Sequence, residues 1–219
     1  MVGAMKKSCI KGLVSLVCNA AVIALTVVCV ARFFTSGGEG NMSSGGGFSA
    51  FRFFTVDSNV LAALSALFVL PWSFRAMLGS NRAMRHRTLL FKYVGACATT
   101  LTMLTVFFFL GPKYGYGAML VGNNLYMHLI TPLLMLVSLV CTENKGDIAF
   151  RETLYGLVPT ALYGAVYIFE TLIVGGWDDF YGFNAGGRWY VFLPVMLAAS
   201  YLICVIVRTL HRVSCGIRR

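Results

Sequence analysis

Two residues within apolar stretches of the sequence have the chemistry of a nucleophile and its base. Thr55 stands near the start of one stretch, and His128 is the only histidine inside another, because His86 and His211 lie among basic residues. A threonine hydroxyl attacks an ester carbonyl only when a positioned base takes its proton, and neutral imidazole does this near neutral pH. The pair therefore suggests ester hydrolysis with Thr55 as nucleophile and His128 as base.

An asparagine lies one helical turn from each member of this pair. Asn59 follows Thr55 by four residues, and Asn124 precedes His128 by four, so each shares a helix face with its neighbour. Pro132, one turn after the histidine, leaves a carbonyl unpaired and bends a helix. Because the oxyanion of ester cleavage needs hydrogen-bond donors, both asparagine amides are candidate substrate-binding groups.

A further polar series runs along another apolar stretch. Tyr163 and Tyr167 share a helix face, and Glu170 follows about one turn later. These three either line the same cavity, where Tyr163 is another candidate oxyanion donor, or anchor the helix at the membrane interface. Asn19, in the first apolar stretch, is expected to form a hydrogen bond between helices.

Structural roles remain open for the same residues. Thr55, Asp57 or Ser58 could cap the start of a helix, while Asn59 could hold two helices together. A single histidine in a helix is also often a hydrogen-bonded structural residue. The seven cysteines include no CxxC pair and have no histidine at ligand spacing, so we expect no metal site and no disulfide framework. One intramembrane histidine also argues against haem, and we expect no cofactor.

The composition places these residues in a membrane. Of 219 residues, 58% are hydrophobic and 12% are charged, whereas soluble domains carry about a quarter charged residues. A soluble core of this length could not bury that much apolar surface, so lipid must cover it. The net charge of +10 is carried by short basic clusters between apolar stretches, which fits helix-flanking residues and not a nucleic-acid-binding surface.

We predict an all-α, polytopic membrane protein whose residues 1–219 form one six-helix bundle. The first apolar stretch is too long for the core of a signal peptide. Each stretch approaches the roughly 20 residues needed to cross a bilayer. The predicted helices are 10–34, 53–78, 89–111, 123–142, 152–175 and 189–210.

The distribution of basic residues predicts the orientation. Fourteen of the 18 Lys and Arg residues fall in the two ends of the chain and in the second and fourth loops. The positive-inside rule then gives a cell-membrane protein with both termini in the cytoplasm. Both helices that carry the pair enter from outside, which puts Thr55 about 6 Å and His128 about 7 Å deep. The Gly/Ser-rich first loop, 35–52, is a lid or a linker, and its composition favours a flexible linker.

The motifs around these residues resemble those of a known family. They are Phe53-Phe-Thr55-x-x-Ser58-Asn59, Asn124-x-x-x-His128-x-x-x-Pro132, Pro159-x-x-x-Tyr163 and Gly175-Gly-Trp-x-x-Phe-Tyr181. Over most of residues 10–210 the chain is similar to the androgen-induced protein and androgen-dependent TFPI-regulating protein family and its bacterial six-helix relatives.

The resemblance implies a membrane hydrolase of fatty acid esters of hydroxy fatty acids, with Thr55 as the nucleophile and His128 as its partner. The sequence departs from the family's patterns in two places. The chain reads Tyr181-Gly182-Phe183 where the bacterial pattern usually has Tyr-Pro-Phe, and its His-to-Pro spacing matches the bacterial branch better. These departures bear on the animal substrate more than on the fold.

Two other classes of function compete with a hydrolase acting on a membrane lipid. In one, His128, Asn59 and Glu170 contact a small ligand or a proton in a binding or transport protein. Transporters commonly contain internal repeats, but the prolines of the apolar stretches reveal no convincing duplication. In the other, the polar residues only pack helices in a structural subunit, so that substituting Thr55 or His128 lowers stability alone.

Overall fold

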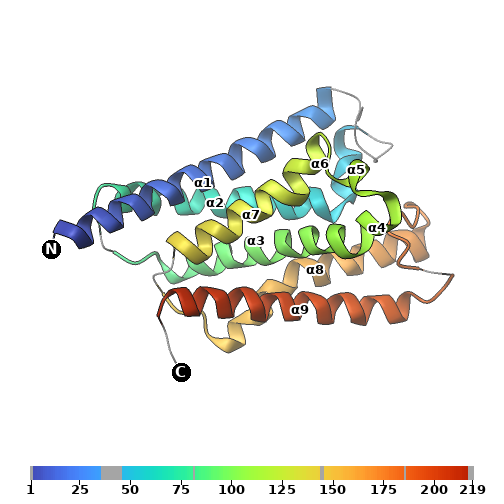
Figure 1. The fold of residues 1–219 in the computed structure, drawn as a ribbon. Helices are drawn as coiled ribbons and strands as arrows, with labels where there is room; N and C mark the ends of the chain where they lie inside the picture. Colours follow the sequence, from blue (N-terminus) through green and yellow to red (C-terminus); the bar gives the residue numbers. More distant parts are fainter. Residues whose placement is uncertain (1, 36–45, 81, 144–145, 185, 217–219) are drawn as a thin grey trace.

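The computed structural model describes residues 2–35, 46–80, 82–143, 146–184 and 186–216 (Figure 1). It is 83% helical, and the described residues form no strand. Six helices in this part of the chain are long and apolar enough to cross a membrane, as predicted. They cover Ser8–Thr35, Phe54–Met77, His86–Tyr114, Asn123–Thr142, Phe150–Val174 and Trp189–Ser214.

Three of the six spans combine α-helix with wider π turns or a short 3-10 turn. The simple spans are α1 (Val2–Thr35), α2 (Phe54–Met77) and α9 (Trp189–Ser214). The third contains α3 (His86–Thr105), η2 (Val106–Leu110) and α4 (Gly111–Tyr114), and the short helix α5 (Tyr116–Met119) follows it. The fourth contains α6 (Asn123–Leu125), η3 (Tyr126–Ile130), α7 (Thr131–Val137) and η4 (Ser138–Thr142). The fifth contains η5 (Phe150–Glu152), α8 (Thr153–Ile168) and η6 (Phe169–Val174).

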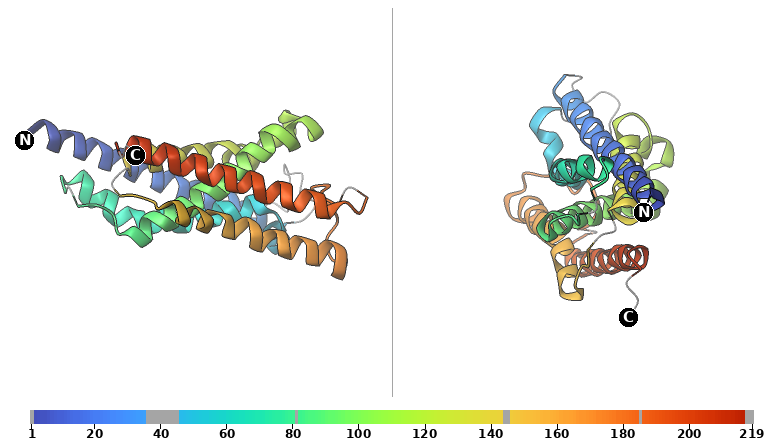
Figure 2. Two further views of the ribbon diagram at one scale, coloured as in Figure 1. Left: turned by 90° about the horizontal axis from the view of Figure 1, so that it is seen from below. Right: turned by 90° about the vertical axis from the view of Figure 1, so that its left-hand side faces the viewer.

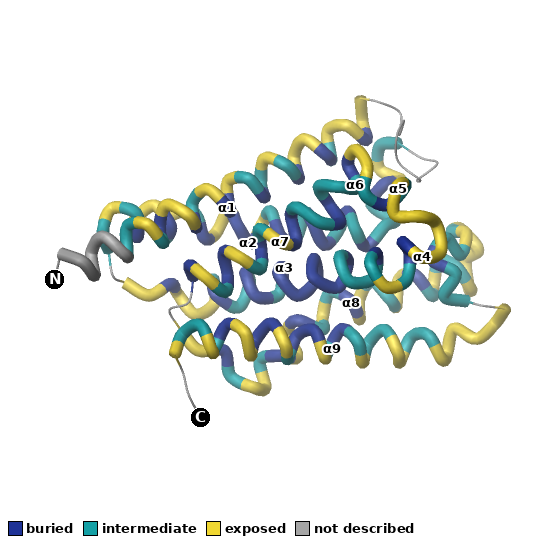
Figure 3. The backbone as a smooth tube through the Cα atoms, in the orientation of Figure 1, coloured by how far each residue is buried: buried dark blue, intermediate teal, exposed yellow. Residues whose placement is uncertain are grey.

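The spans run up and down along one long axis, with α3 in the middle of the bundle. Helices α2, α7, α8 and α9 all pack on α3, while α1 packs mainly along α2 (Figures 1 and 2). The spans differ in how deeply they are buried (Figure 3). In the most apolar 18-residue window of each span, 61% of the residues are buried in the third span but only 6% in the fifth. The two ends of the described chain lie at the same end of the bundle (Figure 1).

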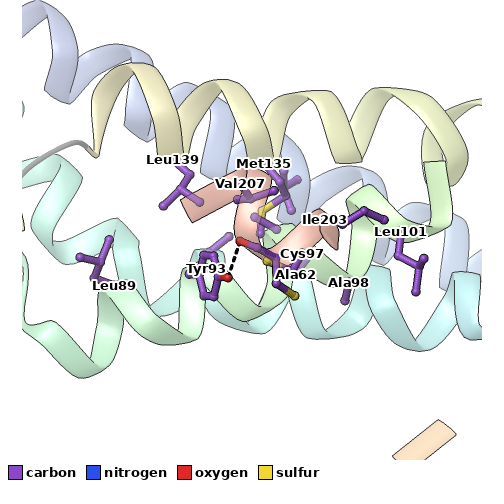
Figure 4. Packing of buried hydrophobic residues seen from close by; sticks show 14 of the residues in the cluster. Ala62, Leu89, Tyr93, Cys97, Ala98, Leu101, Met135, Leu139, Ile203 and Val207 are labelled. Atoms are coloured by element: carbon purple, nitrogen blue, oxygen red, sulfur yellow. Dashed lines mark hydrogen bonds between the residues drawn. The ribbon is translucent and has the colours of Figure 1, made fainter. Parts of the chain in front are cut away.

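The core surrounds α3 and depends on close approach between helices. Tyr93, Cys97 and Leu101 of α3 are buried among side chains from α2, α7 and α9 (Figure 4). The hydroxyl of Tyr93 donates a 2.7 Å hydrogen bond to the carbonyl of Cys204 in α9. Many large apolar side chains outside this core are exposed, which is the pattern of a surface in contact with lipid.

A network of buried polar groups joins three spans at the opposite end from the N-terminus of α2. Lys92 donates from Nζ to Asn19 Oδ1 at 2.7 Å, and Asn19 donates from Nδ2 to Glu143 Oε1 at the same distance. The expected interhelical hydrogen bond of Asn19 is therefore present. Lys92 lies within the predicted helix 89–111 and Glu143 directly follows the predicted helix 123–142, but the sequence did not predict their contact with Asn19. Both side chains are fully buried, since the asparagine amide bridges their opposite charges.

Part of the loop after α1 lies among the described residues. Residues 36–45, where the Gly/Ser-rich linker was predicted, lie outside the described residues. The prediction does not hold for the following segment, because η1 (Gly47–Arg52) is a 3-10 helix in which Ala50 is fully buried. This short helix leads directly into the first turn of α2.

Candidate active site

Thr55 and His128 are in contact. The hydroxyl oxygen of Thr55 lies 3.3 Å from Nε2 of His128, although the residues are 73 positions apart. Thr55 is the second residue of α2, and His128 is the central residue of η3. The distance is that of a loose hydrogen bond, which is common between a nucleophile and its base before substrate binds.

The other ring nitrogen fixes the orientation of the imidazole. Nδ1 of His128 lies 2.7 Å from the backbone carbonyl oxygen of Met119, and the side chain is buried. A carbonyl oxygen only accepts hydrogen bonds, so Nδ1 carries a proton. In the neutral ring, Nε2 is then an acceptor that faces the Thr55 hydroxyl, which is the form a general base requires.

A π turn places His128 at this position. In η3 the N–H of Thr131 bonds to the carbonyl of Tyr126, five residues earlier, and Pro132 has no N–H to continue an α-helical ladder. Gly122, with φ of 56°, turns the chain just before this span. The turn brings the segment that ends at Met119 back over the histidine, since positive φ is easy for glycine.

The two asparagines hold the backbone around the pair. Asn59 donates from Nδ2 to the carbonyls of Thr55 at 2.7 Å and Met127 at 3.0 Å, which uses both amide hydrogens. Asn124 donates to the carbonyl of Ala118 at 3.1 Å. Asn59 is therefore not a free oxyanion donor. It fastens α2 to η3, while Asn124 fixes the segment that accepts the histidine proton.

Helix capping does not explain Thr55. The N-cap of α2 is Phe53, and no side chain caps the helix there. Ser58 donates instead to the Thr55 carbonyl and also contacts the hydroxyl of Thr102, at 2.9 Å. The backbone N–H of Thr55 lies in the first turn of α2, where N–H groups have no acceptor within the helix and the helix dipole is positive.

Tyr181 belongs to the site but was not among the residues predicted to form it. Its hydroxyl oxygen accepts a 3.1 Å hydrogen bond from the N–H of Phe54, and the phenol lies next to Thr55. Burial raises the pKa of Tyr181 to about 12, so the hydroxyl keeps its proton at neutral pH. The only signal in the sequence was the Gly-Gly-Trp-x-x-Phe-Tyr motif that ends at this residue.

Thr55 and Tyr181 lie between two chambers. The apolar chamber, of about 80 Å³, lies among α2, α3, α8 and α9. The polar chamber, of about 180 Å³, includes His128, Arg52 and Asp178. An ester at Thr55 could therefore place an apolar chain on one side and a polar part on the other.

Of the three residues predicted in the fifth span, two lie at the site and one does not. Tyr163 and Tyr167 both line the apolar chamber, and their hydroxyls donate 2.7 Å hydrogen bonds to the carbonyl of Arg52 and to Oδ1 of Asp179 respectively. Glu170 lines neither chamber, and its side chain lies beside Gly176. The structure therefore brings both tyrosines to Thr55 and leaves Glu170 apart.

No group of three or more His, Cys, Asp or Glu side chains in the described part of the chain is arranged to hold a metal ion. The arrangement that remains is a hydroxyl, an oriented imidazole and hydrogen-bond donors at a helix N-terminus. No protein-family model, curated protein or solved structure matches the chain.

Proposed function

We propose that this protein is an intramembrane lipid-ester hydrolase with Thr55 as nucleophile and His128 as general base. The observation that supports it best is the continuous chain of contacts from the Thr55 hydroxyl to His128 and on to the Met119 carbonyl. This arrangement supplies a base of defined tautomer without a carboxylate partner. A purely structural histidine would not need its free ring nitrogen directed at a hydroxyl.

The first half of the reaction transfers the acyl group to the enzyme. Thr55 Oγ1 attacks the ester carbonyl carbon while His128 Nε2 takes the hydroxyl proton. The Tyr181 hydroxyl and the N–H of Thr55 donate to the oxyanion that forms. The carbon–oxygen bond to the alcohol then breaks, and the protonated imidazole gives its proton to the departing alkoxide.

The second half releases the acid. Water attacks the acyl–threonine ester, and His128 takes a proton from it. The bond to Thr55 Oγ1 breaks, the threonine oxygen regains a proton from the imidazole, and the carboxylic acid leaves. The polar chamber gives water a route to the ester, since it contains His128, Arg52 and Asp178.

The apolar chamber is the proposed acyl site. Its volume of about 80 Å³ is smaller than the roughly 150 Å³ of an apolar cavity that is known to bind benzene. In the conformation described it fits a chain of only a few carbons, so longer chains require the chamber to open between α8 and α9. We expect turnover of p-nitrophenyl esters to decline beyond short acyl chains, and Gly164→Val, which fills one wall, to shift the preference further toward acetate.

The proposed setting is the cell membrane, with both termini in the cytoplasm and the site in the outer leaflet. The two ends of the described chain share one end of the bundle, and Thr55 lies toward the other. The basic residues concentrate in the ends and even-numbered loops, which supports this orientation. A membrane lipid ester would reach the site sideways from the outer leaflet.

The decisive experiment is hydrolysis of p-nitrophenyl butyrate by purified protein in nonionic detergent. Thr55→Ala and His128→Ala should each lower kcat/KM by at least about 10³-fold, because residues that act as a unit are individually essential. His86→Ala, outside the site, is the matched control and should retain activity.

A covalent probe separates catalysis from stability. A fluorophosphonate should modify the Thr55 oxygen with loss of fluoride, and the modified peptide identifies the residue by mass spectrometry. His128→Ala should abolish labelling while the thermal unfolding temperature stays near that of the native protein. Native turnover by Thr55→Ala would refute the proposal, and so would variants that only unfold at lower temperature. Proton-linked uptake without ester cleavage would favour transport instead.

A further inference from the structure

A large groove on the membrane-facing side adjoins the apolar chamber, with which it shares Phe54 and Tyr163 as lining residues. It lies between α2, α3 and α8, and its volume of about 880 Å³ exceeds those of the chambers several-fold. Sites for drug-sized ligands commonly occupy about 300–1,000 Å³. The fifth span, which forms one wall, is the least buried of the six, so the groove is open to lipid.

The groove contains an acidic residue that the proposed hydrolysis does not use. Asp57 follows Thr55 by two residues, which places the two side chains about 200° apart around α2. Thr55 lines both chambers, whereas Asp57 lines the groove and is only partly buried. Among the described residues, no side chain donates a hydrogen bond to the Asp57 carboxylate or forms an ion pair with it. An unpaired acid at this depth is costly, which points to a ligand that compensates it.

Aromatic rings accompany this carboxylate. Phe51, Phe54, Tyr163 and Trp177 line the same groove, and the rings of Phe54 and Tyr163 lie 5.1 Å apart in a tilted arrangement. Aromatic faces attract organic cations, and the attraction grows when water is excluded. A carboxylate among aromatic rings is complementary to an ammonium group.

The rest of the groove is apolar and ends at a positive charge. Leu61, Leu90 and Val94 continue the wall toward the other end of α2, where Arg87 lines the groove. Phe91 also lines the groove, and its ring packs 5.7 Å from that of Phe68, which lies about 16 Å along α2 from Asp57. The groove is thus long enough for an alkyl chain, and its arginine disfavours a cationic group at that end.

We propose that this groove binds a single-chain amphiphile with a cationic amine head. The ammonium group pairs with Asp57 among the aromatic rings, and the alkyl chain lies along the apolar wall toward Arg87. The proposed amine site does not use Thr55 or His128, although it shares Phe54 and Tyr163 with the apolar chamber. Occupancy by this ligand compensates a charge that the protein itself leaves without a partner.

Tryptophan fluorescence tests the proposal, because Trp177 lines the groove. A Trp72→Phe/Trp189→Phe background leaves Trp177 as the only tryptophan, which is excited selectively at 295 nm or above, roughly where tyrosine no longer absorbs. A brominated C16 alkylamine should quench it with a Kd at least tenfold lower than the identically brominated C16 alcohol. Asp57→Asn should remove this difference, and Asp57→Glu should retain most of it.

The matched control is Asp178→Asn, which changes an acid in the polar chamber and should leave amine binding unchanged. Thermal unfolding in detergent shows whether each variant is folded, and Asp57→Glu still tests charge dependence if the asparagine variant is unstable. Equal binding of amine and alcohol would overturn the proposal. Tighter binding of the C16 carboxylic acid, lost in Arg87→Ala, would instead assign the groove to an anionic lipid.

Discussion

His128 and Met119, nine residues apart, are joined by a 2.7 Å hydrogen bond from the imidazole Nδ1 to the backbone carbonyl. A carboxylate in this position would stabilise the imidazolium that forms during catalysis, whereas a neutral carbonyl stabilises it less. The contact therefore orients the ring more than it increases its basicity. The tautomer is fixed by backbone, and no single side-chain substitution removes the acceptor.

The proposed base must be neutral to act. Protonation of Nε2 at low pH removes the acceptor that the Thr55 hydroxyl needs. We therefore expect kcat/KM to rise with pH until His128 is neutral and to stay constant at higher pH. A plot of kcat/KM for p-nitrophenyl butyrate against pH measures this limb. His128→Asn keeps a donor close to the Met119 carbonyl but has no base, and it should be folded and inactive at every pH. Activity independent of pH down to about 4 would contradict the assignment.

Tyr181→Phe removes one proposed oxyanion donor and the acceptor of the Phe54 N–H. We expect a loss of about 10²–10³ in kcat. The free energy of unfolding should fall by about 1–3 kcal/mol, because a buried N–H loses its partner. Since burial raises the pKa of Tyr181 to about 12, the native enzyme should keep this donor through pH 10.

The control for this variant is Tyr114→Phe, whose exposed hydroxyl bonds to the Phe180 carbonyl at 3.3 Å. It should alter kcat little. Steady-state kinetics and thermal unfolding of both variants separate the two effects. A Tyr181→Phe enzyme with native kcat would remove the phenol from the mechanism.

The buried charges of Lys92 and Glu143 should depend on each other. Lys92→Met leaves the carboxylate buried and uncompensated, which is expected to cost about 3–5 kcal/mol of stability. Adding Glu143→Gln should restore part of that loss, so the double variant will be more stable than the sum of the single effects predicts. Thermal unfolding in detergent measures the stability of the native protein, both single variants and the double variant. Lys113→Met, at an exposed lysine, serves as the control. Strictly additive losses would show that the two charges are not coupled.

Gly12 sets the distance between α1 and α2. A Cβ at this position would lie 2.1 Å from the backbone nitrogen of Met77, so the helices must separate. Gly12→Ala should lower stability by about 1–3 kcal/mol, as other overpacked substitutions do. Gly117→Ala places its Cβ where no atom lies within 4 Å and should be close to neutral. Equal unfolding temperatures for the two variants would show that the close approach is unimportant.

The proposed orientation can be tested with reporters. Green fluorescent protein fused after Arg219 should fluoresce, and alkaline phosphatase fused there should be inactive, because the C-terminus is expected in the cytoplasm. Phosphatase inserted at Gly187, between the fifth and sixth spans, should be active. The reverse pattern at both positions would place Thr55 and His128 in the inner leaflet.

The proximity of Thr55 and His128 was accessible from sequence because it depends on two coarse quantities. Hydropathy locates where each helix begins, and the rise per residue gives the depth of each side chain. The partner of Nδ1 was not accessible, because it depends on a π turn and on a tight turn at Gly122. Neither the π turn nor the turn at Gly122 produces a periodic pattern of apolar residues in the sequence.

The burial of Lys92 and Glu143 was not predicted from the sequence. A hydropathy reading treats a charged residue near a span end as part of a loop, which is usually right because an isolated buried charge is costly. Here Asn19 sits between the two groups, and the pair is neutral as a unit. Only three-dimensional placement identifies such a bridge, since its members come from three different spans. Tyr181 was also not predicted as a site residue. It lies in the loop between the fifth and sixth spans, where hydropathy does not indicate which side chains fold back onto the site.

The π turn at Tyr126–Ile130 makes the register of the fourth span sensitive to chain length. Such a turn holds one residue more than the corresponding α-helical turn. Deleting a single residue from it would let the segment continue as ordinary α-helix, and side chains on its two sides would rotate by about 100° relative to each other. Either His128 would lose its contact with Thr55, or the side chains of α7 would turn away from the core. Deletion of one residue here is therefore expected to be more damaging than most substitutions.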